Sequence, residues 1–535
     1  MNGRGETLER AALLLALLLT AGLAWPLRHY VTDDTYIHLR YAQQLARGEG
    51  FVFNTGERVY GTTSPLWVLC LAEAMALGVD GLLASKLLGA AATLAALLLW
   101  WALVRRTLDS PWLRACATVA WAGHAWMLRW SLSGMETPLA VCLVLAGCVA
   151  FTANRPWGAR AGLASLLWAL AGLARPECVL LLPLWALLLL LDHGGSAGIA
   201  VAARTLWPGA LVLCGWLAFA WGWFGRIWPN TLAAKAAGGE GLAYHVEQLE
   251  RQAAIVATTD AAMVLVAIAL LAMRLRRGER PVLEPMTRFL PWVWMAAVPI
   301  LYMLRGVPVL SRYLVPLLPL LAWLTWRLLD GALAGSHPRA SWDSRPRASG
   351  DSRPRASGGS RPRAAMAAGV ALATVALAQN LVAMERLVRP QVDSFTAGMH
   401  ASLEPWGRWF AGHTRVDAVI AAPDIGALGY LSQRRVVDLA GLVTPAMVPI
   451  LRRLSPEDAV ARFEFMKFSR PDVVVDRADA AWDLERRSRY ARALARVGSA
   501  TLPNLGVSHP APAVYSFYRI DWAVVDTIAN SHRDR

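Results

Sequence analysis

The sequence has little charge for its size. Charged residues make up 17% of its 535 residues, hydrophobic residues 56%, and the mean hydropathy is +0.38. Such a chain is too apolar for an ordinary soluble protein. Runs such as "AALLLALLLTAGLAWPL" at 11–27 and "CVLLLPLWALLLLL" at 178–191 are close to the roughly 20 residues that a helix needs to cross a bilayer. The composition predicts an α-helical polytopic membrane protein.

Two further signals are missing. No small-residue cleavage site follows the first apolar run, which is therefore expected to stay as a membrane helix. The cysteines have no metal-ligand spacing and lie in or beside apolar stretches, which favours membrane-core packing over a disulfide framework. There are six of them: Cys70, Cys116, Cys142, Cys148, Cys178 and Cys214.

The net charge of +15 does not indicate nucleic acid. Much of it lies in the tract "SRPRASGDSRPRASGGSRPRA" and in short loops between apolar runs, where arginines mark the cytoplasmic side of a membrane protein. This pattern predicts a cytoplasmic amino terminus and a carboxyl-terminal tail on the outer side. For Arg105 and Arg106 to lie inside, the short apolar segment 64–78 must lie at the interface instead of crossing.

About eleven crossings follow from these rules. They are expected at 11–27, 82–104, 112–130, 137–152, 160–174, 178–191, 206–223, 259–273, 289–304, 309–328 and 365–384.

Four regions are predicted along the chain. Residues 1–330 form the transmembrane core, with a first extracytoplasmic loop at 28–63. Residues 331–364 contain an eight-residue Ser-Arg-Pro repeat that cannot bury a core, and they form a basic cytoplasmic linker. The last crossing, 365–384, precedes residues 385–535, where β-branched runs such as "PDVVVD" alternate with Gly, Pro and Asp. That alternation is typical of an α/β domain.

The stretch "YVTDDTYIHLR" places Asp33 and Asp34 directly after the first crossing. One explanation is helix capping, because Thr32, Asp33 or Asp34 could cap a helix whose apolar face includes Ile37 and Tyr41. A cap needs only one acid, however, and an ionised group near a membrane is costly unless it is used. A carboxylate here could act as a general base for a docked alcohol.

Other polar residues gather at the same outer face. Each has a simple explanation by itself, such as a helix cap, a snorkelling cation or an interfacial aromatic. Together they suit a reaction in which Arg or Lys holds a lipid phosphate while a carboxylate deprotonates an acceptor hydroxyl. We expect Arg312, Lys235 and Arg175 to bind the phosphate. Expected substrate-binding residues are Tyr36, Arg40, Glu57, Glu136, Glu177, Asn230 and Tyr313.

Six motifs occur in order along the chain: "DDTYIHLRYAQQLARGEGFVFNTGERVYGTTSPLW", "SGMETPL", "LARPE", "PNTLAAK", "SRYLVPLLP" and "DIGALGYLSQRRVVDLAGL". Together they resemble bacterial integral-membrane glycosyltransferases of the GT-C superfamily, in the branch related to the mycobacterial terminal β-arabinofuranosyltransferase. The basic repeat and the tail beyond about residue 450 have no counterpart in that pattern.

The resemblance implies an enzyme of the bacterial inner membrane. It would take a sugar, with arabinofuranose suggested by the branch, from a polyprenyl-phosphate donor. The acceptor would be an envelope glycan, lipid or protein on the outer side, and transfer would invert the anomeric centre. Asp33 or Asp34 would be the catalytic base. Two adjacent acids could instead share a divalent cation, Mg²⁺ or Mn²⁺, and the sequence leaves both options open.

Three other functions fit parts of the sequence. A protein or lipopolysaccharide glycosyltransferase would use another polyprenyl-phosphate sugar. A transporter or flippase would place ionisable residues at mid-membrane and often has repeated halves, which these segments lack. A membrane-anchored binding protein would act through its outer domain alone.

Overall fold

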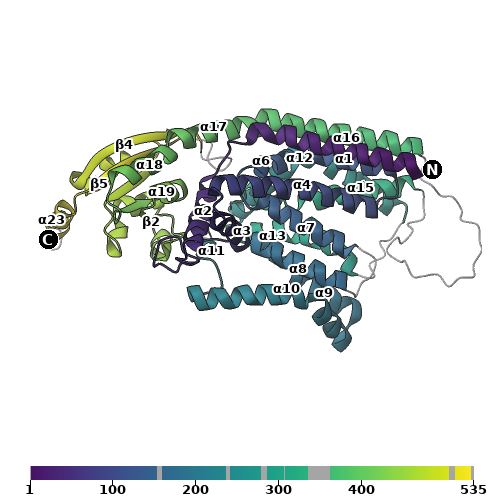
Figure 1. The fold of residues 1–535 in the computed structure, drawn as a ribbon, viewed down its shortest axis with the longest axis horizontal. Coiled ribbons are helices and arrows are strands. Elements are labelled where there is room, and N and C mark those ends of the chain that lie inside the picture. The colour runs from purple at the N-terminus through teal and green to yellow at the C-terminus, as the bar shows by residue number, and fades with distance from the viewer. Residues whose placement is uncertain are drawn as a thin grey trace, which may run out of the picture.

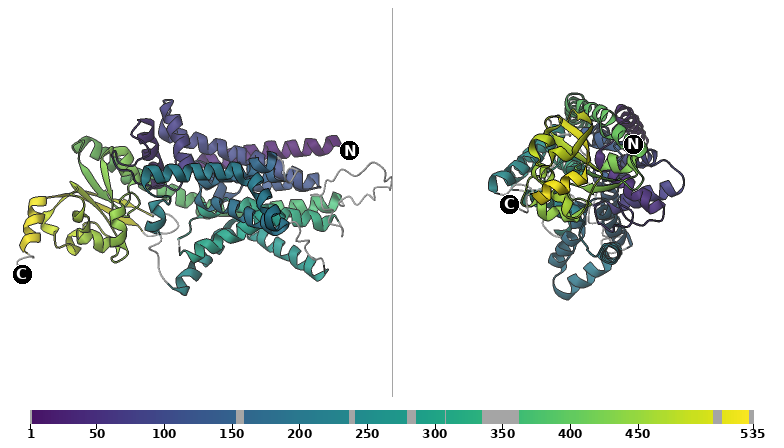
Figure 2. Two further views of the ribbon diagram at one scale, coloured as in Figure 1. Left: turned by 90° about the horizontal axis from the view of Figure 1, so that it is seen from below. Right: turned by 90° about the vertical axis from the view of Figure 1, so that its left-hand side faces the viewer.

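The protein is long, with a helical bundle at one end and an α/β region at the other (Figure 1). A computed structural model describes residues 2–152, 159–235, 241–278, 286–306, 308–334, 362–504 and 512–531. The described chain begins at the end of the bundle far from the sheet and finishes beyond the sheet. Viewed down the long axis, the α/β region covers the end of the bundle (Figure 2).

Seven helical segments of the described chain are long and apolar enough to cross a membrane. They involve α1 (Asn2–Ala24), α4 (Gly81–Thr107), α9 (Leu181–His193), α10 (Gly195–Phe224), α12 (Leu242–Arg276), α13 (Leu290–Leu304) and α16 (Pro362–Ala383). The last continues through a π-helical turn (Met384–Val388) into α17 (Arg389–Ala401) and α18 (Leu403–His413). Each of the seven overlaps a crossing predicted from the sequence.

The expected count of about eleven crossings is not confirmed. The other four predicted spans fold as α5 (Pro111–Ala122) with α6 (Ala125–Ser131), α7 (Thr137–Phe151), α8 (Ala159–Ala174) and α14 (Ser311–Leu314) with α15 (Leu318–Leu333). All are shorter than the roughly 20 residues of a full crossing. The first is divided at Gly123 and His124, and His124 begins a new helix by accepting a bond from the Met127 N–H.

The segment expected at the interface forms α3 (Pro65–Ala76), which at 12 residues is too short to cross a bilayer by itself. In the first loop, α2 (Asp33–Ala46) is the helix predicted after Thr32. Thr32 caps it, because the Thr32 side chain accepts from the Thr35 N–H at 3.2 Å. Neither aspartate is needed as the cap of this helix.

The α/β region contains one five-stranded sheet in the order β2-β1-β3-β5-β4. The strands are β1 (Val419–Ala422), β2 (Arg435–Asp438), β3 (Val473–Ala478), β4 (Leu494–Leu502) and β5 (Ala513–Ile520). Strands β1, β2 and β3 are parallel, whereas β5 is antiparallel to β3 and β4. The carboxyl ends of the three parallel strands therefore share one edge, where α/β proteins commonly bind ligands.

Short helices complete the described chain. They are α11 (Asn230–Lys235), α19 (Gly426–Ser432), α20 (Val448–Leu451), α21 (Pro456–Ala461), α22 (Asp483–Arg487) and α23 (Trp522–Ser531). One continuous cluster of buried apolar side chains extends from the bundle, at Trp100 and Val144, to the sheet, at Ile420 and Phe517. The sheet thus packs directly on the bundle.

Several arginines that the sequence places inside lie at the amino-terminal end of the bundle. Arg105 and Arg114 bind the same Glu9 carboxylate, with N–O distances of 2.8 Å and 3.0 Å. The motif residues of the first loop lie at the opposite end, beside the sheet (Figure 1). Most of the predicted linker, 335–361, lies outside the described residues.

Candidate functional site

A cavity of about 300 Å³ lies where the helical bundle meets the sheet. The bundle and the first loop contribute Asp33, Asp34, Arg129, Trp130 and Arg312 to its lining, and the α/β region contributes others. Its volume falls at the lower end of the range for ligand pockets. Both aspartates of the "TDDT" motif thus border the same space as a candidate phosphate-binding arginine.

Asp34 and Arg312 form a direct ion pair in this cavity. Arg312 Nη2 donates to Asp34 Oδ2 at 2.5 Å, and the two residues are 278 positions apart in the sequence. The Arg312 side chain is 6% exposed and that of Asp34 is 38% exposed. Asp34 therefore keeps access to the cavity while a buried guanidinium holds it in place.

Asp33 has different partners. Its Oδ2 accepts from the Gly426 N–H at 2.9 Å and its Oδ1 from the Ala427 N–H at 2.8 Å, so it binds the first two amides of α19. Burial, followed by the nearby Asp424 carboxylate, raises the pKa of Asp33 to about 7, although the two amides lower it. Consecutive residues of a helix point about 100° apart. Asp33 thus joins the first loop to the α/β region, whereas Asp34 faces the cavity.

Arg129 is a cavity residue that sequence analysis missed. It donates to Gln391 Oε1 at 2.7 Å and to the Tyr30 hydroxyl at 3.4 Å, and no carboxylate in the described chain forms an ion pair with it. Arg129 and Arg312 each have a buried Nε with no hydrogen-bond partner among the described residues. Two buried guanidinium groups with unused donors are suited to an anion.

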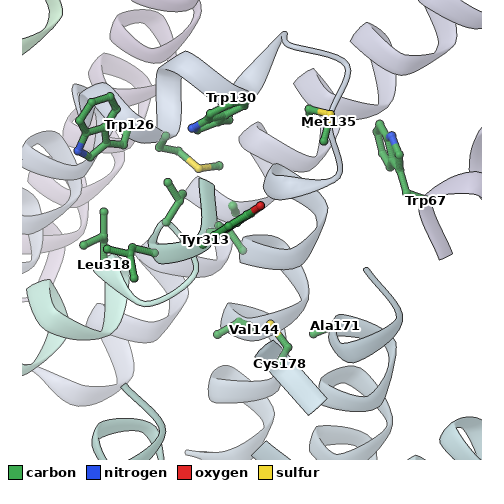
Figure 3. Close-up of a cluster of buried hydrophobic side chains, with 14 of the residues drawn as sticks. Trp67, Trp126, Trp130, Met135, Val144, Ala171, Cys178, Tyr313 and Leu318 are labelled. Atoms are coloured by element: carbon green, nitrogen blue, oxygen red, sulfur yellow. The ribbon is translucent and has the colours of Figure 1, made fainter. Parts of the chain in front are cut away.

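Arg175 does not line the cavity and lies in a buried charge network next to Arg312, because both guanidinium groups lie over the Tyr313 ring. It donates to Glu136 at 2.6 Å and to Glu177 at 2.5 Å, and Glu177 also accepts from the Tyr302 hydroxyl at 2.9 Å. The Arg175 guanidinium lies 4.9 Å from the centre of the Tyr313 ring. Figure 3 shows Tyr313 among buried apolar side chains. Two carboxylates thus already bind Arg175, and its predicted phosphate-binding role stays a prediction.

Four predicted substrate-binding residues connect the bundle to the α/β region. The Tyr36 hydroxyl donates to Glu404 at 2.8 Å, and Arg40 donates to Gln433 at 2.7 Å. Glu57 pairs with Arg435, and Asn230 donates to the carbonyls of Gly441 and Leu442 at 2.5 Å and 3.1 Å. Among the described residues that line the cavity, none of these four occurs. The side chain of Lys235 lies outside the described residues.

The two aspartates, which could share a divalent cation, have different protein partners in the structure. The Asp33 oxygens accept from backbone amides and Asp34 pairs with Arg312. Within the described chain, no group of three or more His, Cys, Asp or Glu side chains could hold a metal ion. A cation shared by Asp33 and Asp34 stays a prediction.

Three further cavity residues, all missed by sequence analysis, come from the α/β region. Asp424 follows β1, Arg477 lies near the end of β3, and Tyr515 is paired with Arg477 across β3 and β5. A signal was present for two of them, because Asp424 begins the motif "DIGALGY" and Arg477 directly follows "PDVVVD". A charged residue at the carboxyl end of a parallel strand is a candidate ligand-binding residue.

The chain resembles known proteins at several levels. Residues 395–531 match a family model described as a domain of unknown function, DUF8728. A segment of 58 residues, 10% of this chain, is 45% identical to a terminal β-(1→2)-arabinofuranosyltransferase of Corynebacterium glutamicum, and it spans only 8% of that relative.

Solved structures match over most of the length. ArnT from Cupriavidus metallidurans, bound to undecaprenyl phosphate, aligns with a TM-score of 0.54 at 12% identity, covering 96% of this chain and 98% of ArnT. The apo oligosaccharyltransferase of Archaeoglobus fulgidus aligns with a TM-score of 0.54 at 12% identity, covering 88% of this chain and 69% of that one. The chain has the GT-C fold. The predicted fold class, a polytopic helical protein with a C-terminal α/β region, is confirmed.

Proposed function

We propose that this protein is an integral-membrane glycosyltransferase that moves a sugar from a polyprenyl-phosphate donor to a cell-envelope acceptor. The observation that carries the proposal is the cavity itself. It joins a partly exposed carboxylate, Asp34, with two buried guanidinium groups, Arg129 and Arg312, that have unused donors. The structural neighbour ArnT, which is described as bound to undecaprenyl phosphate, supports this donor class.

Arg129 and Arg312 hold the donor phosphate in this proposal. Arg312 donates to Asp34 through Nη2, while its Nε has no partner among the described residues. The same guanidinium can therefore hold Asp34 and bind a phosphate oxygen at the same time. As the bond between the anomeric carbon and the phosphate oxygen breaks, the electron pair stays on that oxygen. Preorganised positive charge on the buried Arg129 and Arg312 stabilises the developing phosphate.

Asp34 serves as the general base. An acceptor hydroxyl attacks the anomeric carbon from the side opposite the phosphate, and its proton passes to an Asp34 carboxylate oxygen. One displacement forms the new glycosidic bond and inverts the anomeric centre. Asp33 is less suited to this role because both of its oxygens already bind amides of α19.

We further propose arabinofuranose as the sugar. Its support is the 58-residue similarity to an arabinofuranosyltransferase of a bacterium. The reaction would take place at the outer face of the plasma membrane, because that face carries the first loop and the α/β region when the arginine-rich end of the bundle is cytoplasmic. The acceptor would be an envelope glycan, lipid or protein.

A transporter requires ionisable groups that line a path through the membrane. One buried pair lies among the membrane helices, where His124 Nε2 is 3.0 Å from Asp260 Oδ2, and Asp260 also accepts from the Thr259 hydroxyl. The space around this pair is only about 10 Å³, which is at the limit for one water molecule. The pair is therefore suited to joining helices, and the glycosyltransferase function explains more of the structure.

Membranes that contain the full chain test the proposal. They would be supplied with radiolabelled polyprenyl-phosphate sugars, including arabinofuranose, mannose and aminoarabinose donors, together with an envelope fraction as acceptor. We expect transfer from one donor and its loss, by at least 100-fold, in Asp34→Asn. The matched control is Asp526→Asn, at an exposed acid that pairs with Arg470. Full activity in Asp34→Asn, or no transfer from any donor by wild type, would reject the proposal.

A further inference from the structure

The part of the cavity wall that the α/β region supplies has its own polar group. Arg477 Nη1 donates to Asp424 Oδ2 at 2.9 Å and to Oδ1 at 3.1 Å. The Tyr515 hydroxyl donates to Asp424 Oδ2 at 2.7 Å. Two side chains, one from β3 and one from β5, therefore converge on the Asp424 carboxylate, and all three residues border the cavity.

This group keeps hydrogen-bonding capacity for a ligand. The side chains of Arg477 and Asp424 are 31% and 22% exposed, and both hydrogen bonds from Arg477 to Asp424 come from Nη1. The guanidinium has further N–H donors, and Asp424 Oδ1 accepts one bond, at 3.1 Å. A guanidinium beside a carboxylate offers donors and acceptors together, which matches the hydroxyl groups of a sugar.

The position of the group separates it from the phosphate site. A polyprenyl-phosphate donor must approach from the bundle, because its chain lies in the membrane, and Arg129 and Arg312 come from α6 and α14 of the bundle. Asp424, Arg477 and Tyr515 come instead from the α/β region, which lies beyond the end of the bundle (Figure 1). A water-soluble glycan would enter from that side.

We infer that Asp424 and Arg477 form the subsite that binds the acceptor glycan through its hydroxyl groups, with Tyr515 as a positioning residue that orients the Asp424 carboxylate. The inference rests on the proposed function. The inference assigns a role to residues within 395–531, the region that matches a domain of unknown function. The ligand class is a neutral polyhydroxylated oligosaccharide, since a balanced Arg and Asp pair has no net charge to attract a polyanion.

The chain offers a matched control pair. Arg470 and Asp526 form a bidentate pair at 3.0 Å and 2.9 Å in the same region, but their side chains are 58% and 44% exposed and neither residue lines the cavity. Arg470→Gln and Asp526→Asn therefore remove the same chemistry away from the proposed subsite.

Binding to the full chain in lipid nanodiscs tests the inference without turnover. The probes are undecaprenyl phosphate and two oligosaccharides, one arabinofuranosyl and one mannosyl. We expect Arg477→Gln and Asp424→Asn to weaken binding of at least one oligosaccharide tenfold or more and to change undecaprenyl phosphate affinity less than twofold. Tyr515→Phe, which removes one hydroxyl, should cause a smaller loss of the same kind. The control variants should bind all three probes like wild type.

The outcomes separate the two proposals. Equal oligosaccharide binding by wild type and Arg477→Gln, or no oligosaccharide binding by wild type, would overturn the subsite and leave the donor site intact. An equal loss of undecaprenyl phosphate binding and oligosaccharide binding in Arg477→Gln and Tyr515→Phe would also overturn the subsite, because Asp424, Arg477 and Tyr515 would then have a structural role. Oligosaccharide binding that depends on Arg477, without undecaprenyl phosphate binding, would support the subsite and reject the proposed transferase.

Discussion

At Gly426 the first loop and the α/β region come too close for any side chain. A Cβ built at this position lies 1.9 Å from the Asp33 carbonyl oxygen and 2.8 Å from Asp33 Cγ, whereas real Cβ atoms essentially never show contacts under 3.0 Å. The substitution Gly426→Ala must therefore move α19 away from α2 by roughly 1 Å. The 2.9 Å and 2.8 Å bonds from the Gly426 and Ala427 amides to Asp33 would then exceed hydrogen-bonding distance.

The cost follows from those two bonds. Each pairs a buried backbone amide, and leaving such a donor unsatisfied costs about 1–3 kcal/mol, so their loss costs on the order of 4 kcal/mol in the docking of α19. Every 1.36 kcal/mol is a factor of ten, which makes undocked molecules roughly 10³-fold more frequent. Because Asp34 and Asp424 border the same cavity, undocking also separates the two walls of the proposed active site.

Hydrogen exchange reports this change at the affected amides. In Gly426→Ala the α19 amides should exchange at least 100-fold faster than in wild type, and glycosyl transfer should fall in parallel. The matched control is Gly412→Ala in α18, where nothing lies within 4 Å of a new Cβ and alanine favours the helix. Adding Asp33→Ala should not rescue Gly426→Ala, since the Asp33 carbonyl stays in place. Wild-type exchange in Gly426→Ala would refute the argument.

Two further predictions concern buried acids. Because the pKa of Asp33 is raised from 3.8 to about 7, docking of α19 should weaken as pH rises from about 4 to 7, since over this range the undocked aspartate loses its proton while the docked one keeps it. Limited proteolysis of the first loop in wild type and in Asp33→Asn, compared across this pH range, checks the sign of the pH dependence. An equal pH dependence in the variant would contradict the prediction. Among the membrane helices, His124→Phe replaces the imidazole that pairs with the buried Asp260 by an apolar ring. This substitution should lower the free energy of unfolding by about 3 kcal/mol. Thermal unfolding in detergent measures this loss, with transfer per folded molecule expected to stay unchanged; a loss of transfer at full stability would show a functional role for the pair.

The sequence predicts those parts of the fold that depend on local patterns. The helix after "YVT" and the strands in "PDVVVD" and "AVYSFYRI" appear as α2, β3 and β5, because periodicity and β-branched runs are short-range signals. The break at Gly123 and His124 is not visible in a hydropathy profile. It depends on His124 meeting Asp260 on another helix, 136 residues away.

The site was only partly predictable for the same reason. Asp34 and Arg312 were both expected to be functional, but their pairing is a tertiary contact across 278 residues. Arg129 was hidden within the apolar segment "AWMLRWS", which was assigned to a membrane crossing. Asp33 and Asp34 look equivalent in sequence, and only the position of α19 distinguishes them.

The cavity has one wall from the beginning of the chain and one from near its described end. Asp34 leaves the ribosome some 480 residues before Tyr515, which at 5–20 residues per second is roughly half a minute to a minute and a half. The bundle residues of the site, from Asp34 to Arg312, are thus made before the wall that β3 and β5 supply. The proposed active site is therefore complete only after the sheet has formed.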